Sequence, residues 1–154
     1  MTPFSSNRIE EIDSIKKKRN TIVWISIGFF VFSLTQKCYC TTNNCSDSIM
    51  VFLLGWFAVF SGGAGIAWLA NPFLILSWMA TKRNSKHALW FCLLALCFSL
   101  SFLLFDTITD SESGHQNQII NYKMGYWFWV ASAAILVTGN IFLRLKTHQT
   151  KNNL

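Results

Sequence analysis

The run VFLLGWFAVFSGGAGIAWLANPFLILSWMA, residues 51–80, contains no charged side chain. A helix of this length would measure about 45 Å, whereas the hydrocarbon core of a bilayer is about 30 Å thick. Two crossings of about 15 residues each would move the connection 81–87 to the outside and invert the rest of the chain against its charge distribution. Because Pro72 cannot donate a backbone N–H and disfavours helix at Asn71, we predict a single crossing that bends at Pro72.

Three further charge-free runs surround this one. The chain has 154 residues, of which 52% are hydrophobic and only 13% charged, whereas about a quarter of the residues in a soluble domain are charged. Because about 17 to 25 apolar residues span the hydrocarbon as a helix, we predict an all-α, integral membrane four-helix bundle. The predicted spans are residues 21–38, 49–80, 87–105 and 124–143, within a membrane domain 21–146 that lies between a leader 1–20 and a tail 147–154.

The basic residues predict which way the spans face. Eleven of the thirteen lysines and arginines precede the first span, follow the fourth, or lie between the second and third. The other two connections contain only Lys37 and Lys123, together with four acidic residues. The positive-inside rule therefore places both chain ends and the 81–87 connection in the cytoplasm. The lipid bilayer accounts for the basic clusters, and no soluble domain is left that would bind nucleic acid.

Small residues recur at a spacing of four along the second span and so share one flank of a helix. Such rows let helix backbones approach closely in lipid, and the fourth span offers a matching surface. We therefore predict that these spans cross closely, and that the indole N–H of Trp68 finds an acceptor near Asn71. The predicted packing face or polar pocket consists of Gly62, Gly63, Gly65, Ala67, Trp68, Asn71, Pro72, Gly139 and Asn140. The alternative is a flexible hinge or re-entrant gate.

The leader, residues 1–20, has the pattern of a short amphipathic helix. Asn7 and Glu10 have the spacing of a capping box, and Ile9, Ile12 and Ile15 form a narrow apolar stripe. This pattern predicts a helix on the inner membrane surface, and a frayed polar leader is the alternative. A signal peptide is not favoured, because no cleavage site of small residues follows the first apolar run.

Three cysteines lie in the first outward connection, namely Cys38, Cys40 and Cys45. The outward side is oxidising, so we expect a disulfide, either Cys40–Cys45 or Cys38–Cys45, because Cys38–Cys40 would be strained. The sequence CYC is similar to the cysteine pairs of four-helix, quinone-linked thiol oxidases. Those proteins have cysteine pairs in both outward connections, whereas the second connection of this chain has none. A structural disulfide is therefore the preferred interpretation.

The stretches GWFAVFSGGAGIAWLANP and GYWFWVASAAILVTGN resemble the small, uncharacterised four-span proteins of bacterial inner membranes. This resemblance implies a topology without an activity. We predict no catalytic residues, cofactor or metal ligands, since the histidines lie in three different connections. The expected function is that of an accessory protein that binds a membrane partner or forms a homo-oligomer. The alternatives are a small passive transporter or pore for a neutral or lipid-like solute and, third, a thiol-redox protein.

Overall fold

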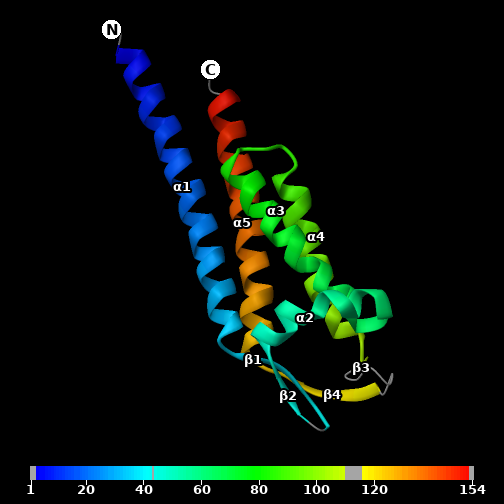
Figure 1. Ribbon diagram of the computed structural model, residues 1–154. Coiled ribbons are helices and arrows are strands. Elements are labelled where there is room, and N and C mark those ends of the chain that lie inside the picture. Colours follow the sequence, from blue (N-terminus) through cyan, green and yellow to red (C-terminus); the bar gives the residue numbers. More distant parts are fainter. Residues whose placement is uncertain (1–2, 43, 110–115, 153–154) are drawn as a thin grey trace.

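The computed structural model describes residues 3–42, 44–109 and 116–152. The chain is mostly helical, with the long helices side by side and a small sheet at one end (Figure 1). The start of α1 (Pro3–Leu34), the far part of α5 (Met124–Asn152) and the turn between α3 (Ala70–Lys82) and α4 (Ala88–Ser101) lie at the other end. We call these the sheet end and the basic end.

Helices α1 and α5 pack along each other, with the two chain directions opposed (Figure 1). Gly139 permits this approach, because a Cβ there would meet the side chain of Ile22. The predicted boundary between a leader helix and a first span is not observed, since α1 continues through residue 20 without a break. No glycine or proline stands near this position to end the helix. The predicted apolar stripe depends on Ile9 and Ile12, whose side chains lie outside the described residues.

The prediction of a bend at Pro72 is wrong. Helix α2 (Ser48–Ser61) ends ten residues earlier, at Gly62 and Gly63, whose φ angles are +73° and +58°. Glycine adopts such angles at little steric cost. A 3₁₀ helix, η1 (Gly63–Leu69), follows and leads directly into α3. Pro72 is the third residue of α3, within the first turn, where a proline is tolerated in an α-helix.

Helix α2 folds back onto η1 to form a tight hairpin at the sheet end (Figure 1). A Cβ on Gly65 would overlap the backbone carbonyl of Ala58, so the two segments are in backbone contact. The Trp68 indole N–H donates to the carbonyl oxygen of Phe52 at 2.9 Å. The small residues of the second apolar run therefore allow close contact between α2 and η1, which both belong to that run, rather than contact with another span.

The predicted close crossing of the second and fourth spans is not the main helix contact. Helix α3 packs chiefly on α4 through a turn at Asn84, and α5 packs chiefly on α1. Single polar contacts nevertheless join α3 to α5. The Asn140 Nδ2 donates to the Thr81 Oγ1 at 3.0 Å, and both residues are buried. Hydrogen bonds therefore connect two helices that share little surface.

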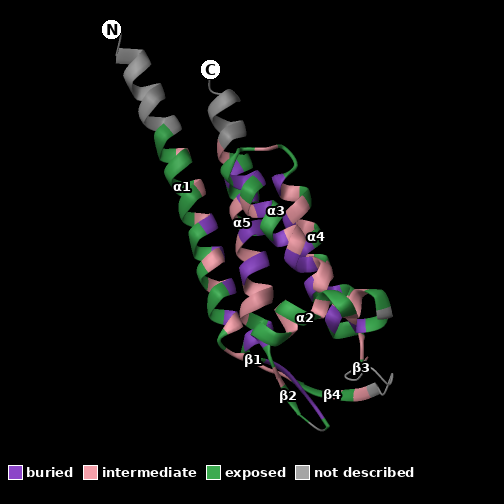
Figure 2. Ribbon diagram, in the orientation of Figure 1, coloured by how far each residue is buried: buried purple, intermediate pink, exposed green. Residues whose placement is uncertain are grey.

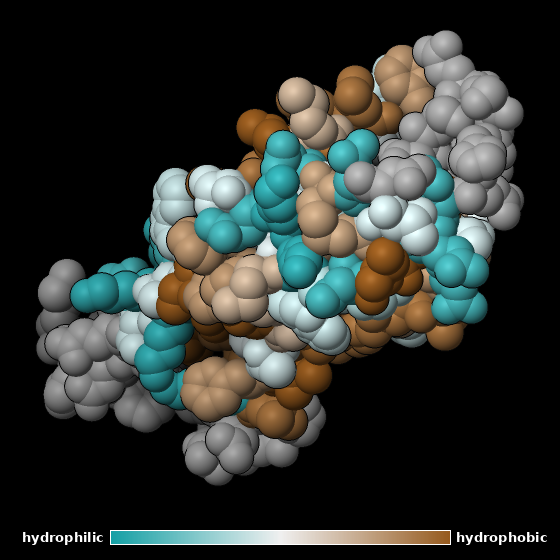
Figure 3. All heavy atoms as spheres, turned by 90° about the horizontal axis from the view of Figure 1, so that it is seen from below, coloured by the Kyte–Doolittle hydropathy of each residue, from teal (hydrophilic) through white to brown (hydrophobic). Residues whose placement is uncertain are grey.

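The all-α prediction needs a correction, because the fold also contains a four-stranded antiparallel sheet. Its order is β2-β1-β4-β3. The strands are β1 (Lys37–Thr41), β2 (Cys45–Asp47), β3 (Thr107–Thr109) and β4 (Gln116–Tyr122). The central β1–β4 pair joins the two connections that were predicted to face outward. Where two loops meet at one end of a protein, their backbone N–H and C=O groups can hydrogen-bond to each other as strands. The sequence of either loop alone does not reveal this pairing. Hydrophilic and hydrophobic side chains are mixed over this end of the molecule (Figure 3).

Two buried clusters fill the interior (Figure 2). One lies among the long helices and includes Val23, Leu74 and Leu136. The other lies beneath the sheet and includes Tyr39, Phe102 and Tyr126. Many large apolar side chains are exposed on the outside of the helices, among them Trp24, Phe60, Leu104 and Leu145.

Two helical segments are long and apolar enough to cross a membrane, Gly63–Lys82 and Met124–Lys146. Two shorter apolar helical segments are also present, Ser48–Phe60 and Ala88–Leu104. Both statements refer to the part of the chain that the structure describes.

Candidate functional site: a cavity beneath the sheet

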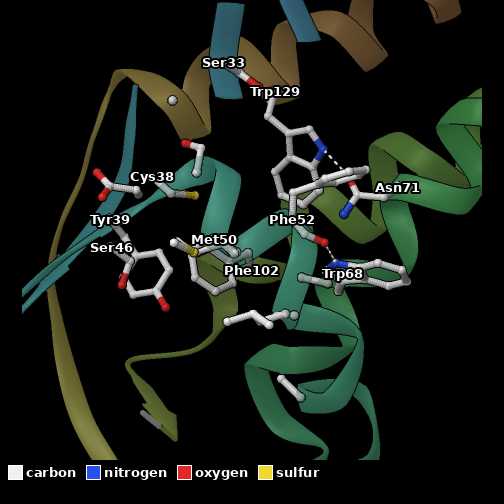
Figure 4. Close-up of a pocket in the computed structure, with 18 of the residues that line it drawn as sticks. Ser33, Cys38, Tyr39, Ser46, Met50, Phe52, Trp68, Asn71, Phe102 and Trp129 are labelled. Carbon is white, nitrogen blue, oxygen red and sulfur yellow. Dashed lines mark hydrogen bonds between the residues drawn. The ribbon is translucent and has the colours of Figure 1, made fainter. Parts of the chain in front are cut away.

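A cavity of about 440 Å³ lies where the sheet, the α2–η1 hairpin and the first turns of α5 meet (Figure 4). Its walls are mostly apolar, with Phe30, Val51, Phe52 and Phe102 among the lining residues. Cys38 and Trp129 point into it from opposite sides (Figure 4). Binding sites for small molecules commonly combine such apolar walls with a few polar groups.

The polar groups at one wall are the Cys38 thiol and the Ser48 hydroxyl. Cys38 is buried in β1, and this burial raises the pKa of its thiol to about 12, although the neighbouring Ser48 hydroxyl opposes the rise. Ser48 Oγ is itself buried and makes no conventional hydrogen bond within the described structure. A Cβ on Gly125 would collide with this oxygen and with the Lys37 carbonyl, so glycine is required for α5 to begin here. This wall therefore holds a neutral thiol and a hydroxyl, and a ligand could form a hydrogen bond with the hydroxyl.

The opposite wall is organised by two tryptophans. The Trp129 indole N–H donates to the Asn71 Oδ1 at 3.0 Å, and the Asn71 side chain points toward the cavity (Figure 4). Trp68 also lines the cavity, but its acceptor is the Phe52 carbonyl rather than a group near Asn71. Because both indole N–H groups already have partners inside the protein, the two rings offer mainly apolar surface to a ligand.

The cysteines are divided between a disulfide and free thiols. Cys40 in β1 and Cys45 in β2 are disulfide-bonded across the hairpin, which is one of the two pairings that the sequence left open. Cys38 is a free thiol, as are Cys92 and Cys97 in α4. Cys45 lies at the edge of the cavity and Cys38 inside it. The disulfide therefore holds β2 in place beside the cavity.

The structure separates the nine predicted packing residues into three groups. Gly65, Ala67, Trp68 and Asn71 line the cavity. Gly62, Gly63 and Pro72 shape the chain next to it. Gly139 and Asn140 lie far along α5, against α1 and α3.

Sequence reasoning missed Ser48, Gly125 and Trp129 as members of this site. They come from the start of α2 and the start of α5, more than seventy positions apart in the sequence. The glycine at the beginning of the fourth apolar run was the available signal, because a glycine there leaves room for a neighbouring chain. Among the described residues, no three His, Cys, Asp or Glu side chains lie close enough together to hold a metal ion.

Comparison of the chain with protein-family models, with curated proteins and with solved structures finds no match.

The disulfide arrangement predicts a labelling pattern. A thiol-alkylating mass tag on the unreduced, denatured protein should modify three sites, Cys38, Cys92 and Cys97, and reduction should raise the number to five. In the native protein at pH 8, Cys38 should react at least tenfold more slowly than after denaturation, because burial raises the pKa of its thiol to about 12 and only the thiolate reacts. The rate should increase with pH.

Replacement of Cys38 by serine is the control, and it should leave two labelled sites before reduction. Fast native labelling of Cys38 would contradict the burial of its thiol. A number of labelled sites that changes with the respiratory state of the cells would contradict a structural Cys40–Cys45 disulfide.

Proposed function

We propose that the chain is one of the small four-span proteins of bacterial inner membranes, and that its cavity binds a neutral, lipid-like molecule. The protein would be an accessory protein whose activity is binding rather than catalysis. The observation that carries the proposal is the mostly apolar cavity, whose polar groups are uncharged apart from the exposed Asp47 carboxylate. The membrane and the ligand are argued separately below.

Exposed apolar side chains support insertion into a bilayer. Phe60 and Leu104 are 84% and 81% exposed, and large exposed side chains recur along α1, α2, α4 and α5. Proteins in water seldom expose extensive apolar surface. The two long apolar segments would provide two crossings, the end of α1 and the α4 segment would provide the other two, and the basic clusters at one end would face the cytoplasm.

The orientation can be tested with reporter fusions. A reporter that is active only in the cytoplasm should be active when fused after Asn20, Lys86 and Leu154, because these positions adjoin the basic clusters. It should be inactive when fused in the connections that contain Cys40 and Glu112. Activity after Glu112 would contradict four crossings.

The lining of the cavity favours a neutral ligand. Asp47 is the charged residue among the lining residues, and its carboxylate lies at the edge, 3.9 Å from the Lys37 ammonium. Met50 and Leu54 of α2 also line the cavity, and they are 57% and 59% exposed. Apolar side chains therefore border the opening on the side of α2, as suits a molecule that arrives from lipid.

The interior beyond the cavity favours binding over conduction. Val23, Leu74 and Leu136 fill the bundle between the cavity and the basic end, with exposures of at most 1%. The buried Asn140–Thr81 hydrogen bond lies farther along the same direction. A thiol-redox role has less support, because the raised pKa of Cys38 leaves little thiolate near neutral pH.

A pair of tryptophan variants on α2 tests the cavity. Val51→Trp places an indole in the cavity, whereas Leu53→Trp adds the same indole on the exposed side of the helix. We expect the wild type and Leu53→Trp to retain dodecanoyl monoglyceride in native mass spectrometry. Val51→Trp should bind it at least tenfold more weakly, because the indole occupies the ligand's volume. Equal binding by both variants would refute the cavity as the site, and thermal unfolding of each variant controls for folding.

Docking of another membrane protein, or of a second copy, is the second candidate. It is favoured by the outward side of α2, where Leu53, Phe57 and Phe60 are 55%, 58% and 84% exposed. A photoreactive residue in place of Phe60, activated in native membranes, should then crosslink to one discrete protein. Crosslinking to lipid alone would rule this candidate out.

A further inference from the structure

A groove of about 610 Å³ runs between α1 and α5 near the basic end, and it shares no lining residue with the cavity beneath the sheet. Helix α1 contributes positions three and four apart, which share one face. The lining residues are Ser14, Lys17, Lys18, Thr21, Ile22, Thr138, Gly139 and Phe142. The groove is therefore a second and independent candidate site.

Two lysines of α1, Lys17 and Lys18, line this groove, and Lys146 of α5 stands beside Lys18. The side chains of Lys18 in α1 and Lys146 in α5 are neighbours. Lys146 lowers the pKa of Lys18, first through this contact and then by charge repulsion. Lys17 adds a third cation from the next position. Like charges this close repel, and an anion between them would remove the repulsion.

Basic side chains outnumber acidic ones at this end of the described structure. Among the side chains that the structure describes, nine lysines and arginines belong to the basic end, whereas Asp13 is its one carboxylate. The Arg144 guanidinium, from the same helix as Lys146, donates to the Lys86 carbonyl oxygen. Lys82 lies 4.8 Å from the centre of the Trp24 ring. These basic side chains belong to the same end of the molecule as the groove.

Below the lysines the groove becomes apolar. Its floor is formed by Ile22 and Gly139, which are in contact, and by Phe142, which is 55% exposed. The hydroxyls of Thr21 and Thr138 donate to carbonyl oxygens of their own helices, at 3.0 and 2.9 Å. A cationic upper part above an apolar floor suits a phosphate ester that carries a hydrocarbon chain, and basic pockets between membrane helices commonly bind such headgroups.

We propose that this groove binds one anionic phospholipid of the cytoplasmic leaflet, with its phosphate between Lys18 and Lys146 and an acyl chain over Phe142. The inference rests on the membrane insertion proposed above but not on the cavity beneath the sheet.

The test compares two double variants that remove the same charge. Lys18→Gln with Lys146→Gln removes the two facing cations, whereas Arg83→Gln with Lys86→Gln removes two exposed cations from the turn at the same end. Each protein is purified in a neutral detergent and titrated with phosphatidylglycerol, phosphatidylcholine or inorganic phosphate, with native mass spectrometry as the measurement.

The wild type and the Arg83/Lys86 variant should retain one phosphatidylglycerol and bind phosphatidylcholine at least tenfold more weakly. The Lys18/Lys146 variant should lose at least tenfold in affinity for phosphatidylglycerol. Equal losses in both double variants would show general charge attraction and overturn the site. Inorganic phosphate that binds as tightly as phosphatidylglycerol would overturn the lipid assignment.

The Val51→Trp variant separates this inference from the cavity, since it should keep its phosphatidylglycerol. A chain found in the soluble fraction without detergent would refute membrane insertion itself.

Discussion

Replacing Gly65 by alanine should lower the free energy of unfolding by about 3 kcal/mol, which is the largest effect of a single methyl group that we expect in this chain. The added Cβ would overlap the backbone carbonyl of Ala58. A flexible side chain could move aside, but a carbonyl within α2 moves only if the α2–η1 hairpin opens. Because Gly65 and Ala58 both line the cavity, ligand binding should weaken together with stability. Thermal unfolding in detergent, followed by circular dichroism, measures the first effect.

Gly28→Ala is the matched control. A Cβ at Gly28 meets no atom within 4 Å, and the residue lies in the exposed part of α1. Alanine should be neutral or stabilise the helix by up to about 1 kcal/mol. If Gly65→Ala were as harmless as Gly28→Ala, the backbone contact between α2 and η1 would not exist.

Replacing Ser26 by alanine should lower the free energy of unfolding by about 1 to 3 kcal/mol, because it breaks a link between three helices. The Ser26 hydroxyl donates to the Ser132 carbonyl oxygen of α5 at 2.8 Å and accepts the Trp78 indole N–H of α3 at 2.9 Å. Ser26 and Ser132 are fully buried. Without this hydroxyl, an N–H and a carbonyl would each lose a partner in the interior.

A double-mutant cycle isolates this link. Ser26→Ala and Trp78→Phe should together cost less than the sum of the two separate losses, since each removes the same hydrogen bond. Thr138→Ala is the control, because that exposed hydroxyl bonds only to carbonyls of its own helix, and it should change stability by less than about 0.5 kcal/mol. Strict additivity of Ser26→Ala and Trp78→Phe would contradict the link.

Several features could be predicted from the sequence because they depend on short stretches. The charge-free runs predicted helices, and the charge distribution predicted that the connections after the first and third runs share one end. In the structure these two connections meet as β1 and β4. The cysteine spacing likewise narrowed the disulfide to two pairings, and the observed Cys40–Cys45 bond is one of them.

The break in the second apolar run shows where local reasoning fails. Gly62, Gly63 and Pro72 all weaken a helix, and the sequence does not say which of them the chain uses. Proline is harmless in a first turn, so a break at the glycines makes Pro72 compatible with α3. The hairpin that follows is stabilised by contacts between Gly65 and Ala58 and between Trp68 and Phe52. The position of the break is thus decided by packing between segments.

Tyr126 illustrates the same difference for single residues. In the sequence it stands among aromatic residues at the end of an apolar run, a position typical of a membrane interface. In the structure it is fully buried beneath the sheet, and its hydroxyl donates to the Ser99 carbonyl oxygen at 3.0 Å. The sheet that covers it consists of strands from two distant connections.

The sequence by itself determined that the chain is mostly helical, that charge is segregated to one end and which cysteines are available for a disulfide, because composition and spacing are local properties. Only the tertiary structure decided the sheet, the partners of each helix, the cavity with Cys38 and Ser48, and the groove with Lys18 and Lys146. These features join residues that are far apart in the chain. They form because distant segments pack closely against each other and because buried polar groups find hydrogen-bond partners in those segments. Neither condition can be evaluated from a short stretch of sequence.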